Sequence, residues 1–175
     1  MKILEMIWAE SVNGVIGKDN KLPWHNKHDL NFFRKTISNK VLIVGRKTYE
    51  SLPKSIIDGR LSKHIIVLTK SRDKLSIVHP SVNVMIAHDK GQAYSHLLQF
   101  PLSTGIVIGG KEIYDLFMPL ANRLFVTTID GYHEGDTTAP FKPSNFKVVD
   151  VEWPGDGCMV HIFEDEDFIR FRNRN

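Results

Sequence analysis

The chain has 175 residues, of which 42% are apolar and 25% charged, close to the average for globular domains. This length fits one domain over residues 1–175, and the composition argues against a disordered or membrane-spanning protein. The net charge of +3 is too small to require a nucleic-acid partner, although it is compatible with a small anionic ligand.

Apolar, β-branched runs bounded by polar turns recur along the chain and predict strands. In chain order these strands are expected at residues 3–9, 40–44, 64–69, 82–87, 105–108 and 124–129. Helical patterns alternate with them, at residues 27–37, 48–52, 90–100 and 111–117. Several of the strands are continuously apolar, as expected where both faces of a sheet are covered. The pattern therefore predicts an α/β fold with a mostly parallel sheet and helices on both faces.

The last third of the chain has a different pattern. Residues 146–151 and 159–163 are strand-like, and the turn signal at 153–157 lies between them, with no room for a long helix. We expect an antiparallel hairpin at the edge of the sheet, which brings the total to about eight strands.

An acid lies on the apolar face of the helix predicted at 27–37. Asp29 precedes Phe33 by one turn, and Leu30 lies on the same side of the helix. A carboxylate there is costly unless a polar partner meets it, which indicates a cationic or hydrogen-bonding ligand. The alternative is a capping box in which Asn26 is the N-cap and Asp29 reaches back to it. The segment alone favours the capping role, and the two roles are compatible.

The residues before this helix form an ordered series. Gly14 to Gly17 follow the first strand, a polar loop spans 18–21, and Leu22-Pro23-Trp24 comes next. Taken alone, the last three residues predict a turn with a buried aromatic side chain. As an ordered set with the acid and the phenylalanine of the helix, the series resembles a signature of the dihydrofolate reductase family.

Two glycines, Gly109 and Gly110, separate the strand at 105–108 from the helix at 111–117. Read from Gly105, the segment imitates a phosphate-binding loop, but Glu112 replaces the required hydroxyl and residues 106–108 are β-branched. A glycine pair either makes a tight turn or lets a flat ligand or a diphosphate approach the backbone. Followed by Ile-Tyr, it resembles a second dihydrofolate reductase signature, in which the pair lies against the nicotinamide of NADPH and its peptide bond is cis.

Cationic turns end two other strands. Arg46 and its neighbours open a helix and would suit a phosphate, or form an exposed first turn. Residues 69–71, with Arg72 beyond them, lie where the family binds the 2′-phosphate of NADPH. No acid stands there to bind the free ribose 2′-hydroxyl of NADH, which favours NADPH. The alternative is a solvated strand end. Arg60 corresponds to the arginine that holds the carboxylate of the folate tail, although residues 53–58 depart from the bacterial pattern.

The resemblance covers residues 3–163 and implies reduction of 7,8-dihydrofolate to tetrahydrofolate by NADPH, which supports one-carbon metabolism and nucleotide synthesis. It implies that Asp29 binds the pterin, while Leu22 and Trp24 control the access of the water that supplies a proton. The further substrate contacts that it implies are Ile7, Trp8, Ala9, Leu30, Phe33, Leu52, Ile57, Arg60 and Thr127. The cofactor contacts that it implies are Ala9, Ile16, Gly17, Leu22, Gly45, Arg46, Lys47, Thr48, Leu68, Thr69, Lys70, Ser71, Ile108, Gly109, Gly110, Lys111, Glu112, Ile113 and Tyr114.

Two of these implications have simpler alternatives. Thr127 matches a threonine that hydrogen-bonds the substrate-holding acid, and is otherwise an ordinary strand residue. Residues 134–137 match a loop that braces the mobile loop after the first strand, and otherwise form a simple turn. Trp8 is bulkier than the small residue common at its position.

Other signals are weak. The lone cysteine, Cys158, and the lack of a signal-peptide pattern in residues 1–5 predict a cytoplasmic protein. His25 and His28 lack a third ligand nearby, so we expect no metal. The opposed charges of residues 164–174 indicate a solvated end. We expect a monomer without nucleic-acid or membrane partners; a sister reductase acting on a pyrimidine ribosyl compound and a non-enzymatic ligand-binding protein are the alternative functions.

Overall fold

The structure is a computed structural model in which residues 2–71 and 80–174 are described. Its strands are β1 (Leu4–Ser11), β2 (Val15–Gly17), β3 (Val41–Gly45), β4 (His64–Leu68), β5 (Asn83–Ala87), β6 (Gly105–Val107), β7 (Arg123–Ile129), β8 (Thr137–Thr138), β9 (Phe146–Gly155) and β10 (Cys158–Asp165). Its helices are α1 (Lys27–Ile37), α2 (Arg46–Ser51), α3 (Lys54–Ile57), α4 (Lys90–Leu98), α5 (Lys111–Phe117), the 3₁₀ turn η1 (Met118–Leu120) and α6 (Glu166–Arg172).

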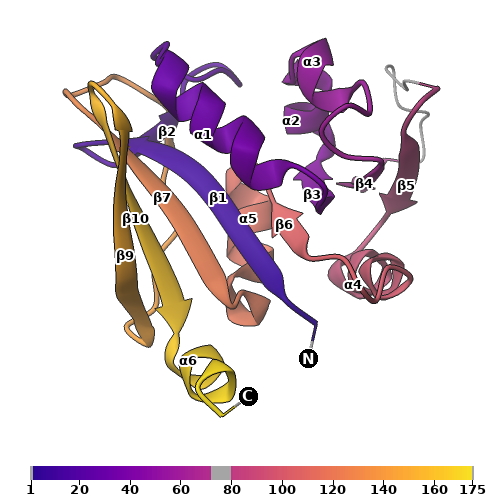
Figure 1. Ribbon diagram of the computed structural model, residues 1–175. Coiled ribbons are helices and arrows are strands. Elements are labelled where there is room, and N and C mark those ends of the chain that lie inside the picture. The colour runs from indigo at the N-terminus through magenta and orange to yellow at the C-terminus, as the bar shows by residue number, and fades with distance from the viewer. Residues whose placement is uncertain (1, 72–79, 175) are drawn as a thin grey trace.

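One eight-stranded sheet organises the chain, in the order β5-β4-β3-β6-β1-β7-β10-β9. The strands from β5 to β7 are parallel to their neighbours, whereas β10 is antiparallel to both β7 and β9. Figure 1 shows this twisted sheet with the C-terminal hairpin at one edge. The predicted mostly parallel sheet and its antiparallel edge hairpin are therefore confirmed.

Each face of the sheet has its own core. Alternation along β1 sends Ile7 to the face covered by α1, α2 and α3, and sends Met6 and Trp8 to the face covered by α4 and α5 (Figure 1). We call these the α1-side core and the α5-side core. Both faces of β3 and β4 are buried, which explains why those segments are continuously apolar.

Helix α1 has the bounds that its sequence predicts. The side chain of Asn26 accepts hydrogen bonds from the backbone amides of His28 and Asp29, at 2.9 and 3.1 Å. Phe32 and Ile37 are buried on the sheet side of the helix. The predicted N-cap and the apolar face together account for this helix.

Several short elements differ from the prediction. Strand β9 continues through Pro154 to Gly155, so the turn expected at 153–157 is reduced to its last residues. Proline is tolerated there because β9 is an edge strand with one partner. Residues 166–172, expected to be a solvated end, form α6, in which Asp165 caps the helix and Phe168 is buried.

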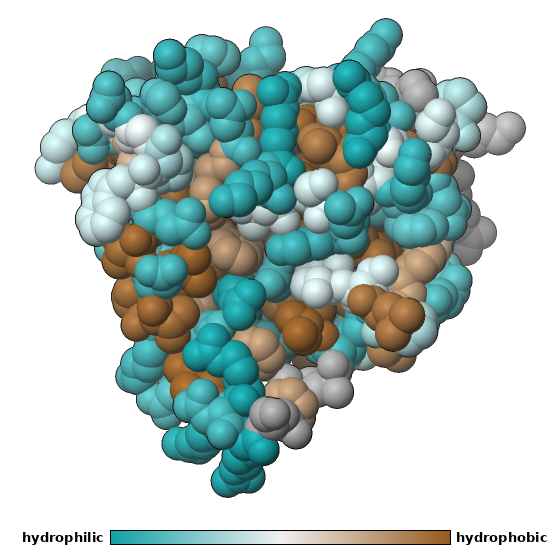
Figure 2. Space-filling view, in the orientation of Figure 1, coloured by the Kyte–Doolittle hydropathy of each residue, from teal (hydrophilic) through white to brown (hydrophobic). Residues whose placement is uncertain are grey.

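The surface is mostly polar. Figure 2 shows polar side chains over much of one face of the molecule, with apolar patches over the C-terminal hairpin. Val148 and Val149 of β9 are 50% and 40% exposed. Among the described residues, no helix has both the length and the apolar character needed to cross a membrane.

Candidate active site

The carboxyl ends of β1, β3, β4, β6 and β7 meet at one edge of the sheet, because these strands are mutually parallel. In the order β3-β6-β1, strands that are distant in the sequence are neighbours in the sheet. In open α/β sheets, ligands bind in the crevice beyond such strand ends. The predicted substrate and cofactor residues come from these ends and from the helices that follow them.

Asp29 faces the sheet rather than the start of its own helix. Its carboxyl interacts with Thr127 of β7, while the Asn26 side chain caps α1. Burial raises the pKa of Asp29 above its ordinary value, and the contact with Thr127 opposes that rise. No ion pair with Asp29 occurs within residues 2–71 and 80–174, so its ionised form is poorly compensated.

Two buried polar atoms, one of them in contact with this acid, have no protein partner of normal hydrogen-bond geometry. The hydroxyl of Thr127 is buried on β7, and the indole nitrogen of Trp24 is buried in the loop before α1. Buried donors without partners are rare and costly in folded proteins. Polar atoms of this kind are satisfied by a ligand or by water.

The loop after β1 lies against the loop after β7. Strands β2 and β8 pair, the Asp19 amide donates to the Asp136 carboxylate at 2.8 Å, and Lys18 pairs with Glu134 at 3.0 Å. The bracing loop expected at 134–137 therefore makes the expected contacts. Trp24 also packs edge-on against His133, with ring centroids 5.2 Å apart, whereas Leu22 is 54% exposed. Sequence reasoning missed His133, because a long-range ring contact leaves no local pattern.

The turns after β6 and β3 touch each other. The Gly109-Gly110 peptide is cis, as the resemblance implied, and the Gly109 carbonyl accepts from the Gly45 amide at 2.7 Å. A Cβ on Gly110 would lie 3.0 Å from the Thr48 hydroxyl, so these turns form a narrow cradle without side chains. Ile108 is buried beneath them.

The helices that follow both turns begin without side-chain caps. Neither Gly45, before α2, nor Gly110, before α5, supplies a capping side chain, so the first amides of both helices remain available. Arg46 is half-buried at the start of α2, whereas Lys47 and Glu112 are exposed. An uncapped helix start beside an arginine suits an anionic diphosphate, so this cradle fits the cofactor that the resemblance implies.

Tyr114 of α5 joins the two halves of the site. Its hydroxyl donates to the carbonyl of Ile7 at 2.7 Å, in the interior of the protein. Burial raises the pKa of Tyr114 far above its ordinary value, and the negative charge of Asp29 adds to the rise. The same hydroxyl lies 3.1 Å from where a Cβ on Gly109 would be, next to the glycine pair.

Other predicted cofactor residues lie around this centre. Ala9, Ile16, Gly17, Lys111 and Ile113 are half-buried near the ends of β1, β2 and β6. At the end of β4, Leu68 and Thr69 are buried, Lys70 is exposed, and the Ser71 amide donates to the Thr69 hydroxyl at 3.1 Å. Arg72 lies outside the described residues.

The predicted contacts for the substrate tail lie between α1 and α3. Figure 2 shows apolar surface between α1 and the α2–α3 segment. Leu30, Phe33 and Leu52 are half-buried, whereas Ile57 is 2% exposed and belongs to the α1-side core. Arg60 is exposed and already pairs with Asp58, whose carboxylate lies 2.7 Å from Nε and 2.6 Å from a terminal nitrogen. Sequence reasoning did not anticipate that an incoming carboxylate would compete with Asp58.

Trp8 differs from the other predicted substrate residues. Its side chain lies in the α5-side core, on the face of β1 opposite to Ile7, and is 4% exposed. Period-two alternation along the strand explains this direction, which a resemblance in sequence position does not reveal. The indole therefore does not share a face of the sheet with Asp29.

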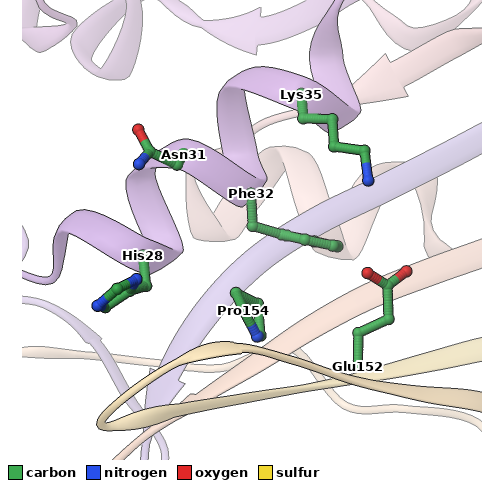
Figure 3. Close-up of a pocket in the computed structure, with 6 residues that line it drawn as sticks. All are labelled: His28, Asn31, Phe32, Lys35, Glu152 and Pro154. Carbon is green, nitrogen blue, oxygen red and sulfur yellow. The ribbon is translucent and has the colours of Figure 1, made fainter.

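A shallow groove lies on another face of α1 (Figure 3). It is lined by His28, Asn31, Phe32, Lys35, Glu152 and Pro154, from α1 and from β9. Asp29 and Phe33 are absent from this lining, so the groove is separate from the crevice at the strand ends. Within residues 2–71 and 80–174 no group of three His, Cys, Asp or Glu side chains is placed to hold a metal.

Known proteins resemble most of the chain. The family model described as dihydrofolate reductase matches residues 3–157. The dihydrofolate reductase of Enterococcus faecium is 36% identical over 75% of this chain and 74% of its own, and that of Bacillus subtilis is 33% identical over 86% and 83%. A structure of the Enterococcus faecalis dihydrofolate reductase complexed with NADP(H) and RAB-propyl has 27% identity and a TM-score of 0.73, covering 94% of this chain and 97% of that one. The chain belongs to the dihydrofolate reductase family.

Proposed function

We propose that the crevice at the strand ends reduces dihydrofolate, with Asp29 as the group that holds the pterin. As a member of its family, the chain is an NADPH-dependent dihydrofolate reductase. The observation that carries the residue assignment is the Asp29 carboxylate, which contacts the Thr127 hydroxyl of β7 and has no ion-pair partner within residues 2–71 and 80–174. A pterin has a planar edge that carries hydrogen-bond donors, and a carboxylate can accept hydrogen bonds from them.

The ionised carboxylate of Asp29 accepts two donors from the pterin edge, and Thr127 orients it from β7. Leu22 and Trp24 exclude bulk water when their loop lies over the site, and they leave access for the water that delivers a proton to the ring nitrogen. Ile7, Ala9, Leu30 and Phe33 contact the ring, while Leu52, Ile57 and Arg60 contact the tail.

NADPH supplies the hydride when it is bound. The cradle formed by Gly45, Gly109 and Gly110 lets the cofactor approach the backbone, and the starts of α2 and α5 meet its phosphates. The further contacts that we propose for the cofactor are Ile16, Gly17, Arg46, Lys47, Thr48, Leu68, Thr69, Lys70, Ser71, Ile108, Lys111, Glu112, Ile113 and Tyr114.

The assignment is tested by Asp29→Asn, which keeps the size of the side chain and removes its charge. We expect turnover of dihydrofolate at neutral pH to fall by about three orders of magnitude, because a neutral amide cannot accept both donors. NADPH binding, measured by its fluorescence, should persist. The control is Asp150→Asn on the exposed strand β9. Turnover near the wild-type level in Asp29→Asn would reject the assignment. In the wild-type protein, activity confined to a pyrimidine ribosyl substrate would favour the sister reductase.

We also propose that residues 1–175 form one domain and act as a cytoplasmic monomer. The eight-stranded sheet, which includes strands from both the first and the last part of the described residues, supports one domain. Cys158, the only cysteine of the sequence, is free and buried, which suits a reducing compartment. Light scattering across a range of protein concentrations would test the monomer, and a mass of two chains would contradict it.

A further inference from the structure

The indole of Trp8 is held in place on the face of β1 away from the substrate. Its Nε1 donates to the Glu10 carboxylate at 2.7 Å, and its ring packs against Tyr114 with centroids 5.5 Å apart. The residue is 4% exposed, so the ring has little freedom to move. Glu10 lies two positions further along the strand and points to the same face.

A lysine from a distant segment completes this arrangement. Lys142, in the segment between β8 and β9, donates to the second oxygen of Glu10 at 3.1 Å, and its ammonium lies 5.6 Å from the centre of the Trp8 ring. The side chains of Glu10 and Lys142 are only 16% and 31% exposed. An ion pair shielded from water and a cation over an aromatic face both stabilise one orientation of the indole.

The side chain that this indole contacts lies at the centre of the proposed site. Tyr114 donates to the Ile7 carbonyl, on the strand that carries the proposed substrate contacts, and its hydroxyl lies beside Gly109. A displaced Tyr114 ring would lengthen the 2.7 Å bond to Ile7 and move the hydroxyl away from Gly109. Side chains that hold a catalytic group in place are as necessary as the group itself.

We propose that Trp8, fixed by Glu10 and Lys142, is a positioning residue that holds the Tyr114 hydroxyl against the Ile7 carbonyl. The inference rests on the proposed function, because it assigns Trp8 a part in the same reaction. It differs from the role that the resemblance implied, in which Trp8 lines the pterin pocket. The bulky side chain acts from the opposite side of the sheet, through Tyr114.

Two variants test the arrangement, one at the ring and one at the cation. Trp8→Phe keeps an aromatic ring and removes the indole N–H, and Lys142→Met keeps the length of the stem and removes the charge. In single-turnover reactions followed by NADPH loss, we expect both variants to slow reduction by about tenfold. The KM for dihydrofolate and the affinity for NADPH should stay within about twofold of wild type. Trp153→Phe, at an indole that is 70% exposed on β9, is the matched control and should react at the wild-type rate.

A double-variant cycle separates positioning from general packing. If Trp8 acts through the Tyr114 hydroxyl, Trp8→Phe should cause no further slowing in a Tyr114→Phe background. A second measurement needs no turnover: in ligand-free protein labelled with ¹³C at the tyrosine ring carbon that bears the oxygen, the Tyr114 resonance should shift in Trp8→Phe and in Lys142→Met. It should not shift in Trp153→Phe.

The outcomes are distinguishable. An unchanged rate in Trp8→Phe and Lys142→Met, an unchanged Tyr114 resonance, or equal slowing in the presence and absence of the Tyr114 hydroxyl would overturn the inference. Should Trp8→Phe fold poorly, Lys142→Met tests the same arrangement from the surface. A wild-type protein that fails to reduce dihydrofolate would instead refute the proposed function, and the resonance would still report whether Trp8 holds Tyr114.

Discussion

Gly135 lies where the loop after β7 crosses β2, and we expect Gly135→Ala to separate the two. A Cβ at this position would lie 2.2 Å from Cγ1 of Val15 and 2.5 Å from the carbonyl oxygen of Gly17. Both distances are far shorter than any normal contact, and the second involves a backbone atom that cannot rotate away. The pairing of β2 with β8 must therefore open to admit one methyl group.

The size of the effect follows from the hydrogen bonds that this movement breaks. The bonds near Gly135 run from the Asp136 amide to Gly17 at 3.1 Å, from the Ala139 amide to Gly14 at 2.8 Å and from the Asp19 amide to the Asp136 carboxylate at 2.8 Å. Each contributes about 0.5–1.5 kcal/mol, so losing all of them destabilises the closed loop by about 2–4 kcal/mol. This change lowers the ratio of closed to open loop by about two orders of magnitude.

The assay is single-turnover reduction, with amide hydrogen exchange of residues 15–17 as the structural measurement. Gly135→Ala should react at least about tenfold more slowly, because the loop that carries Trp24 excludes water from the site only when it is closed. The control, Glu134→Ala in the same loop, removes an exposed ion pair with Lys18 and should behave like wild type. A wild-type rate together with unchanged exchange protection of β2 in Gly135→Ala would refute the reasoning.

Other substitutions give further predictions. Asp29→Asn should raise the free energy of unfolding at neutral pH, since burial raises the pKa of Asp29 and disfavours its ionised form. Each unit by which the pKa is raised corresponds to a gain of about 1.4 kcal/mol. Urea titrations should show this gain shrinking as the pH falls, until it vanishes below the pKa of Asp29 in the unfolded chain; no gain at pH 7 would contradict the prediction. Arg123→Met should lower the urea midpoint by the equivalent of about 3 kcal/mol, because it leaves two buried carboxylates with fewer partners, whereas Arg170→Met on the surface of α6 should change little. Gly59→Ala should lower the free energy of unfolding by about 1–3 kcal/mol, because Gly59 has a φ of +84° and a Cβ there would lie 2.7 Å from the Ser81 carbonyl; an unchanged melting temperature would argue against this strain.

The elements that local pattern specifies were predicted well. Helix α1 has the predicted bounds because the Asn26 cap and its apolar face both lie within one segment. The parallel strands were predictable because both faces are buried, which leaves continuous apolar runs. Helix α6 was missed because four of its seven residues are charged and Phe168 is its single buried residue. Strands β2 and β8 pair residues 15–17 with residues 137–138, a contact that neither segment indicates alone.

The residues of the site were predictable to the extent that they are ordered along the chain. The series from Gly17 to Phe33 and the pair Gly109-Gly110 identify the family, and the structure brings both to the same edge of the sheet. Side-chain direction was not predictable in the same way. Trp8 lies in the α5-side core, on the face of β1 opposite to Ile7, and Arg60 is engaged by Asp58.

Carboxylates at the two ends of the sheet have opposite environments, and this contrast supports the proposed position of the site. At the amino end of β1, Glu5 is buried and pairs with Lys40 and Arg123, while Glu164 of β10 pairs with Arg123 and Arg172. These acids are paired with cations within the protein, and the ion pairs of Glu164 connect α6 to the sheet. At the carboxyl end, the only described neighbour that opposes the raised pKa of Asp29 is the neutral Thr127 hydroxyl. A folded chain retains such uncompensated groups at a cost in stability, and a ligand that satisfies them recovers that cost as binding energy.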